Sequence, residues 1–201
     1  MNGFLIVPIV EGKGEEEAVP RLLHRLFQQV RSDSFLKVNP PLRIKLQRFL
    51  KGDDYFQKYI ELAAAKAKGH LRGGVLILLD CDDGCPVEIG RSLAQKAREV
   101  RPDVPFVIAL ARREYETWFL AAACSLRGVA GIPANLEPPP EPEAIRGAKE
   151  WLSRQMEGGY DPLIHQLLFT ERFSLEEARR SRSFARFNDR LRQFFEVRST
   201  P

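Results

Sequence analysis

Short apolar runs alternate along the chain with segments in which apolar residues recur at helical spacing. The runs Leu5–Val10, Val75–Leu79 and Val104–Ala111 are typical of buried strands, and Arg43–Gln47 alternates like a half-buried strand. This order of strands and helices favours an α/β fold with a mostly parallel, four-stranded sheet flanked by helices. The helices predicted between and after the strands are Glu15–Val30, Asp54–Lys68, Val87–Val100 and Thr117–Leu126.

Proline marks a division in the second half of the chain. Residues 133–142 contain five of the 14 prolines, a composition typical of a connection. We therefore predict an α/β core at residues 1–132 and a helical extension at residues 143–201 that packs on the core. Helices are expected at Glu143–Met156, Pro162–Phe169 and Ser183–Val197.

Pro8 is an unusual residue for the first predicted strand. It has no backbone N–H to donate to a neighbouring strand. We therefore expect this strand to lie at a sheet edge or to carry a bulge at Pro8.

The composition is that of a soluble globular chain. It is 44% hydrophobic and 29% charged over 201 residues, and no apolar run reaches the ~18–20 residues that a membrane span requires. The first residues lack the basic start and cleavage site of a signal peptide. The three cysteines have no disulfide-framework spacing, so a cytoplasmic protein without a membrane partner is expected.

Positive charge is concentrated near the C-terminus. The formal net charge is +4, and from Glu171 onward there are eight arginines and five acids. If the segment from Phe169 to Phe195 is largely helical, Arg179, Arg182 and Arg186 can share a face and bind the phosphates of DNA or RNA. The alternative is a solvated face on which these arginines pair with neighbouring acids.

Acidic residues follow three of the predicted strands. Glu11 comes after the first, Asp80 and Asp82 follow the strand at Val75–Leu79, and Glu114 and Glu116 follow the last. Carboxyl ends of parallel strands share one sheet edge, so these side chains are expected to converge. Carboxylate oxygens suit Mg²⁺ or Mn²⁺, which predicts a shared metal site. Taken singly, each acid could instead cap the helix that follows.

Several segments resemble toprim domains. Glu11-Gly12 after an apolar strand resembles their first motif, and Asp80-Cys81-Asp82 resembles their second. The stretches Arg113–Ala121 and Ser181–Phe187 are more specifically similar to small stand-alone toprim-like proteins, a group related to the overcoming-lysogenization-defect nucleases. The resemblance covers most of the chain.

The resemblance implies a Rossmann-like toprim core and roles for individual residues. Glu11 corresponds to the toprim glutamate, a metal ligand or general acid/base, while Asp80 and Asp82 correspond to metal ligands. Related nucleases place a further acid near Glu15 or Glu16, between which the sequence does not choose. Because proteins of this group are often encoded beside ATPases, a partner ATPase is also implied.

Lys149 is a further candidate for a catalytic role. Its positive charge would stabilise the transition state of phosphoryl transfer, although a lysine on a helix surface is the alternative interpretation.

These residues together predict a Mg²⁺-dependent nuclease or phosphodiesterase that acts on DNA or RNA. One alternative is a non-catalytic subunit of an ATPase complex that binds nucleic acid or a nucleotide. Another is a ribonuclease with a PIN-like fold. The sequence has no phosphate-binding P-loop, which excludes ATP hydrolysis by that route.

Overall fold

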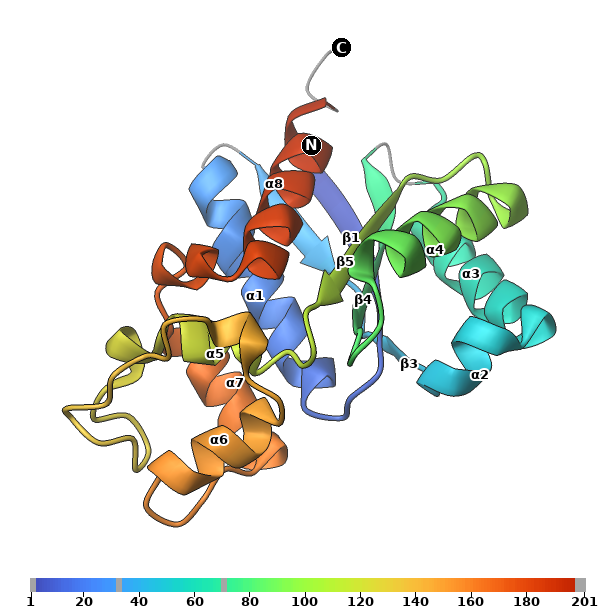
Figure 1. The fold of residues 1–201 in the computed structure, drawn as a ribbon. Coiled ribbons are helices and arrows are strands. Elements are labelled where there is room, and N and C mark those ends of the chain that lie inside the picture. The colour runs from blue at the N-terminus through green and yellow to red at the C-terminus, as the bar shows by residue number, and fades with distance from the viewer. Residues whose placement is uncertain (1–2, 32–33, 70–71, 198–201) are drawn as a thin grey trace.

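The computed structural model describes residues 3–31, 34–69 and 72–197 (Figure 1). None of the helices in these ranges has the length and apolar character needed to cross a membrane. The strands are β1 (Gly3–Val10), β2 (Phe35–Val38), β3 (Leu42–Arg43), β4 (Gly73–Asp80) and β5 (Phe106–Ala111). The helices are α1 (Glu15–Val30), α2 (Leu46–Lys51), α3 (Asp53–Ala67), α4 (Pro86–Val100), α5 (Thr117–Ala121), α6 (Ala148–Gln155), α7 (Pro162–Arg172) and α8 (Arg182–Val197).

The five strands form one parallel sheet, so the predicted α/β class is confirmed. The strand order is β2-β1-β4-β5, and β3 also pairs with β1 beyond the end of β2. From β1 the chain crosses to β2 on one side and later returns to β4 on the other. The order therefore reverses between β1 and β4, and the carboxyl ends of strands at such a switch point are where ligands bind in open α/β sheets.

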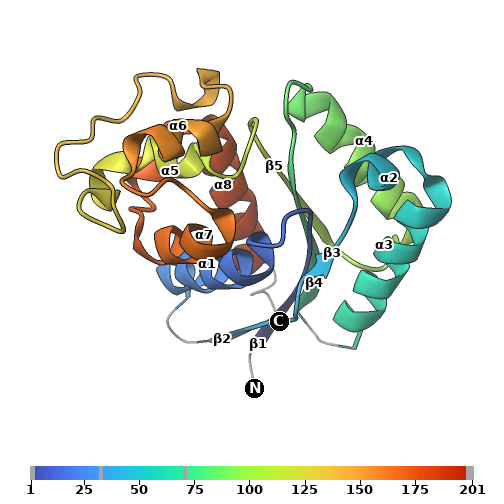
Figure 2. The same cartoon turned by 90° about the horizontal axis from the view of Figure 1, so that it is seen from below.

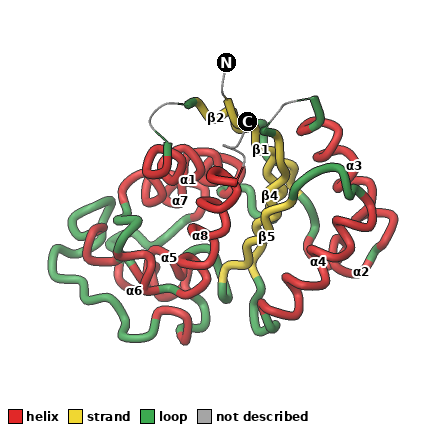
Figure 3. Tube along the Cα trace, turned by 90° about the horizontal axis from the view of Figure 1, so that it is seen from above, coloured by secondary structure: helices red, strands yellow, loops and turns green. Residues whose placement is uncertain are grey.

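Alternate side chains of the strands enter two separate apolar layers. Ile6 and Leu76 belong to the layer beneath α1 and α5–α8, whereas Val7 and Ile77 belong to the layer beneath α2–α4. Figures 2 and 3 show the sheet between these two groups of helices. Because side chains of a strand point alternately to opposite faces, strands buried on both faces read as the continuous apolar runs in the sequence.

The helices after the proline-rich segment share the larger of these layers. Arg25 on α1 donates hydrogen bonds to the backbone oxygens of Thr170 (2.6 Å) and Phe173 (2.8 Å) at the end of α7. At the other end of the sheet, the ring centroid of Phe195 on α8 lies 5.2 Å from that of Phe4 on β1. Helices α7 and α8 therefore pack in the same hydrophobic core as one face of the sheet.

The observed elements differ from the predicted ones in four places. The helix expected at Thr117–Leu126 ends at Ala121 as α5, and a 3₁₀ helix follows at Ala123–Leu126. The strand expected at Arg43–Gln47 pairs only over β3, and α2 already begins at Leu46. Strand β2 was not predicted, because its four residues alternate between exposed and buried in too short a run. The helix expected at Glu143–Met156 is interrupted, and α6 starts after Gly147, whose φ of 67° is left-handed.

Pro8 lies in the middle of an interior strand, so the expectation of an edge or a bulge is wrong. It is opposite Leu76 of β4 in the register. On the other side of β1, backbone N–H groups of Asn39 and Ile44 donate to the backbone oxygens of Ile6 and Val10. Pro8 lies between these two bonds, where β2 has ended and β3 has not begun, so its missing donor leaves no gap in the ladder.

Candidate active site

The site lies where β1 and β4 end beside one another. Ile9 is paired with Ile77, so Glu11 and Asp80 leave the sheet at the same edge. The side chain of Asp80 is 16% exposed, and its Oδ1 accepts a hydrogen bond of 2.8 Å from the backbone N–H of Tyr115. This bond ties the end of β4 to the segment that follows β5.

Lys149 on α6 reaches into the same edge. Its Nζ lies 3.1 Å from Glu116 Oε2, 3.5 Å from Glu114 Oε1 and 4.0 Å from Asp80 Oδ2. The backbone N–H of Lys149 also donates to Glu114 Oε2 at 3.1 Å, which fixes the first turn of α6. We call Glu11, Glu15, Asp80, Glu114 and Glu116, with Lys149 among them, the carboxylate cluster.

Glu116 is the most deeply buried acid of the cluster. Its side chain is 0% exposed, and its Oε1 accepts a hydrogen bond of 3.0 Å from the hydroxyl of Tyr160. Its Oε2 lies 3.1 Å from Lys149 Nζ in an ion pair. Burial raises the pKa of Glu116, while Lys149 and Tyr160 favour its charged form. The cation that Oε2 faces is thus the ammonium group of Lys149.

Glu15 belongs to the cluster, and Glu16 does not. The Oε2 atom of Glu15 accepts hydrogen bonds of 3.2 Å from the backbone N–H groups of Glu11 and Gly12. These bonds hold the turn in which Glu11 lies. Burial, with a smaller contribution from Glu116, raises the pKa of Glu15 to about 7. Glu16 instead lies 3.7 Å from Arg43 at the surface.

The charges of the cluster are not balanced. Burial raises the pKa of Asp80 well above its usual range, and Glu15 and Glu116 raise it further. Burial and the nearby charge of Asp82 likewise raise the pKa of Glu11. Burial alone would lower the pKa of Lys149, but Glu116, Asp80 and Glu114 together raise it. A site with several carboxylates and one ammonium group takes up protons or a further cation readily.

Asp82 is at the margin of the site. It is exposed, and its φ of 42° is left-handed, a conformation that Asp tolerates better than most residues. A bridge between Asp82 and Arg113 joins the loops after β4 and β5. The negative charge of Asp82 helps to raise the pKa of Glu11, so the two carboxylates interact.

The predicted nucleic-acid-binding arginines separate into two groups. Arg179 lies on a 3₁₀ turn (Glu177–Arg180) before α8 and is 3.2 Å from Asp189. The condition for a shared face, one largely helical segment over Phe169–Phe195, is not met, because the chain breaks between α7 and α8 and Arg179 lies outside α8. Arg182 and Arg186 are exposed on α8 and line a groove described below.

Within residues 3–31, 34–69 and 72–197, no group of three or more His, Cys, Asp or Glu side chains is arranged so that it could hold a metal ion. The cation among the carboxylates is the ammonium group of Lys149. The sequence indicated Glu11, Asp80, Glu114, Glu116 and Lys149 as candidates, and the structure brings all of them to one edge. The sequence did not point to Tyr160 and left Glu15 and Glu16 as alternatives.

We expect stability to depend on pH through Glu15. Its pKa is about 7 in the folded protein against 4.5 ordinarily, so the folded state holds this proton more tightly than the unfolded state. Stability is therefore lost as pH rises from about 4.5 to about 7, by up to about 3 kcal/mol, since one pKa unit is worth about 1.4 kcal/mol. In urea titrations across this range, Glu15→Gln should lessen the decrease, and the raised pKa values of Glu11, Asp80 and Glu116 account for what remains. In contrast, Glu17→Gln, at an exposed position of α1, should keep the whole decrease. An undiminished decrease in Glu15→Gln would contradict the assignment.

Comparison with known proteins gives a family for the chain. The model of a family described as "Domain of unknown function (DUF4276)" matches residues 10–192. No curated protein and no solved structure matches the chain. The matched range begins at the last residue of β1 and includes the whole carboxylate cluster. Because the match spans most of its length, the chain belongs to the DUF4276 family.

Proposed function

We propose that the protein is a Mg²⁺-dependent nuclease or phosphodiesterase whose active site is the carboxylate cluster. The observation that carries the proposal is the meeting of Glu11, Asp80 and Glu116 with Lys149 at the switch point of the sheet. Buried acids that raise one another's pKa repel each other when charged. A purely structural ion pair needs only one acid and one base, without this repulsion. Such clusters are typical of functional sites.

The donor atoms are of the type that a hard divalent cation prefers, although in the described residues they are not already arranged as a metal site, so binding would require their side chains and Lys149 to rearrange. All the acidic ligands are carboxylate oxygens, and Glu116 Oε2 is a buried oxygen that already faces a cation, the ammonium group of Lys149 at 3.1 Å. We infer that Glu11, Asp80 and Glu116 would hold Mg²⁺ or Mn²⁺, with Asp82 and Glu114 at the margin. The metal, when bound, would neutralise phosphate charge and lower the pKa of a coordinated water.

The residues of the chain supply the rest of the chemistry. Water attacks phosphorus, a new P–O bond forms, and the ester P–O bond breaks as the leaving sugar oxygen takes a proton from solvent water. The carboxylate of Glu11, half-buried and with a raised pKa, accepts the proton of the attacking water. The ammonium group of Lys149, 35% exposed, donates to phosphate oxygens as negative charge develops on them.

The sequence resemblance to toprim domains supports the same proposal, because Glu11 and Asp80 are the residues that correspond to its two motifs. A toprim-like nuclease of this kind is expected to act with an ATPase partner.

The test is cleavage of labelled DNA and RNA, single-stranded and duplex, with Mg²⁺, Mn²⁺ or EDTA. We expect cleavage of at least one substrate with either metal and none with EDTA. The proposal is wrong if the pure wild-type protein cleaves no substrate with either metal, or if Glu11→Gln cleaves as fast as wild type.

A second candidate is a non-catalytic nucleic-acid-binding subunit. It is favoured by the ion pairs of Lys149, which already neutralise part of the cluster and join α6 to the sheet. In this case the protein binds nucleic acid with or without metal, and no cleavage occurs.

A further inference from the structure

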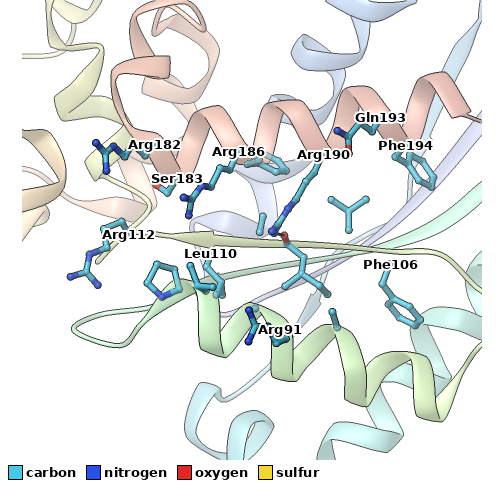
Figure 4. A pocket seen from close by; sticks show the side chains of 18 of the residues that line it. Arg91, Phe106, Leu110, Arg112, Arg182, Ser183, Arg186, Arg190, Gln193 and Phe194 are labelled. Atoms are coloured by element: carbon cyan, nitrogen blue, oxygen red, sulfur yellow. Dashed lines mark hydrogen bonds between the residues drawn. The ribbon is translucent and has the colours of Figure 1, made fainter.

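A long groove runs along the free edge of the sheet. Its floor is β5, the last strand in the order, and its walls are α4 on one face of the sheet and α8 on the other (Figure 4). The volume of the groove is about 1030 Å³. Apolar side chains such as Phe106 and Leu110 form much of the floor, so the groove combines an apolar base with polar rims.

Arginines dominate both rims. The acidic residue of the lining is Glu143, whose Oε1 accepts hydrogen bonds from Ser181 Oγ (2.8 Å) and the backbone N–H of Ser183 (2.7 Å). The Glu143 carboxylate is therefore hydrogen-bonded to residues at the start of α8. The arginines of the groove are Arg91, Arg98, Arg112, Arg182, Arg186 and Arg190.

The groove arginines, like Arg192 beside them on α8, are in no ion pair among the described residues. In contrast, nearby Arg179 pairs with Asp189 and Arg113 pairs with Asp83. Like charges held along one channel repel each other and raise the local concentration of anions. The complementary ligand is a chain of negative charges.

The floor of the groove is arranged against pairing with another β-strand. Arg190 donates a hydrogen bond to the backbone oxygen of Ile108, in the middle of β5. An added peptide strand needs the free backbone groups of the edge, and here a side chain already occupies one of them. An acidic peptide that extends the sheet is therefore disfavoured relative to a polyanion that contacts the guanidinium groups.

One end of the groove reaches the carboxylate cluster. Arg112, which lines the groove, donates to the backbone oxygen of Gly84 at 2.7 Å, in the loop that follows Asp80 and Asp82. Within the sheet, Ala111 at the end of β5 is directly paired with Asp80. A chain that lies along β5 toward its carboxyl end thus arrives beside the candidate active site.

We propose that this groove binds a single strand of nucleic acid, with its phosphates on the arginines of α4 and α8. The floor is the edge of one β-strand between two single helices, which suits one extended chain, and half-buried Phe106 offers a surface on which a base can stack. The inference rests on the proposed function in one respect: the strand's path toward the carboxylate cluster delivers a substrate only if the cluster is an active site. Binding in the groove itself does not require catalysis.

The test is binding of a labelled single-stranded oligonucleotide in EDTA, measured by fluorescence anisotropy over a salt titration. The variant is Arg182→Ala with Arg186→Ala, in the groove. The matched control is Arg172→Ala with Arg192→Ala, which removes the same charge from exposed residues that do not line the groove. Circular dichroism verifies that both variants are folded.

We expect the groove variant to bind at least about tenfold more weakly at low salt, and the slope of log affinity against log salt to fall by about 1.4, or about 0.7 per phosphate contact. The control should bind like wild type, and duplex DNA and polyglutamate should bind wild type more weakly than the single strand. Equal weakening in both variants, or tighter binding of the duplex or polyglutamate, overturns the inference. Binding is measured in EDTA, without metal, so it does not depend on cleavage. If the wild type binds the strand in the groove but does not cleave it with Mg²⁺ or Mn²⁺, only the proposed function is overturned.

Discussion

Replacing Asp80 with Asn is expected to reduce metal-dependent cleavage by at least about a thousandfold. A bound metal contributes several kcal/mol to transition-state stabilisation, and each ~1.4 kcal/mol is a factor of ten in rate. The substitution Asp80→Asn keeps an acceptor oxygen for the backbone N–H of Tyr115 and removes a charge that repels Glu15 and Glu116. The fold should therefore remain, with equal or greater stability at pH 8.

The measurement is the single-turnover cleavage rate in Mg²⁺, together with urea unfolding of the same samples. Asp83→Asn is the control, because Asp83 lies in the same loop but pairs with Arg113 and Arg146 outside the cluster. We expect this control to cleave at a rate close to that of wild type. An Asp80→Asn variant that cleaves as fast as wild type would remove Asp80 from the active site.

Replacing Lys149 with Met is expected to destabilise the protein at pH 8 by about 2 kcal/mol. Removal of one partner from a buried ion pair costs about 3–5 kcal/mol, and the expected loss is smaller here because Lys149 is partly exposed. Glu116 would be left buried without its cation, so its pKa should rise further above the ordinary value. Since protonation relieves this cost, the loss of stability should be smaller at pH 5.

Urea unfolding at both pH values tests this expectation. Lys96→Met provides the comparison, because Lys96 pairs with Asp53 at 3.0 Å on the surface, where an ion pair contributes little. If Lys149→Met and Lys96→Met have the same small effect at pH 8, Lys149 does not neutralise the cluster.

The sequence predicted the order of elements well where the apolar pattern was strong. Strand β4 and helix α1 bury continuous or periodic apolar residues, and such patterns leave few alternatives. Strand β2 has four residues and a single buried side chain, Leu36, so no local pattern distinguishes it from a loop. The interior position of Pro8 depends on where β2 ends and β3 begins, which is a property of the assembled sheet.

The candidate site was predictable to the extent that it follows from sheet geometry. Glu11 and Asp80 lie at the ends of parallel strands, so their convergence follows from the fold class. The contacts of Lys149 and Tyr160 with Glu116 join residues far apart in the sequence, and no spacing rule connects them. The groove was likewise hidden, because the arginines of α4 and those of α8 come together only across the edge of β5.

Binding of a divalent cation by the carboxylate cluster is tested most directly by anomalous scattering from crystals soaked in Mn²⁺. Asp80→Asn crystals, soaked in the same way, are the control. We predict an anomalous peak in contact with the carboxylates of Glu11 and Asp80 in the wild type and no peak in the variant. Wild-type crystals without a peak at this position, with Lys149 still paired to Glu116, would contradict the proposed metal site.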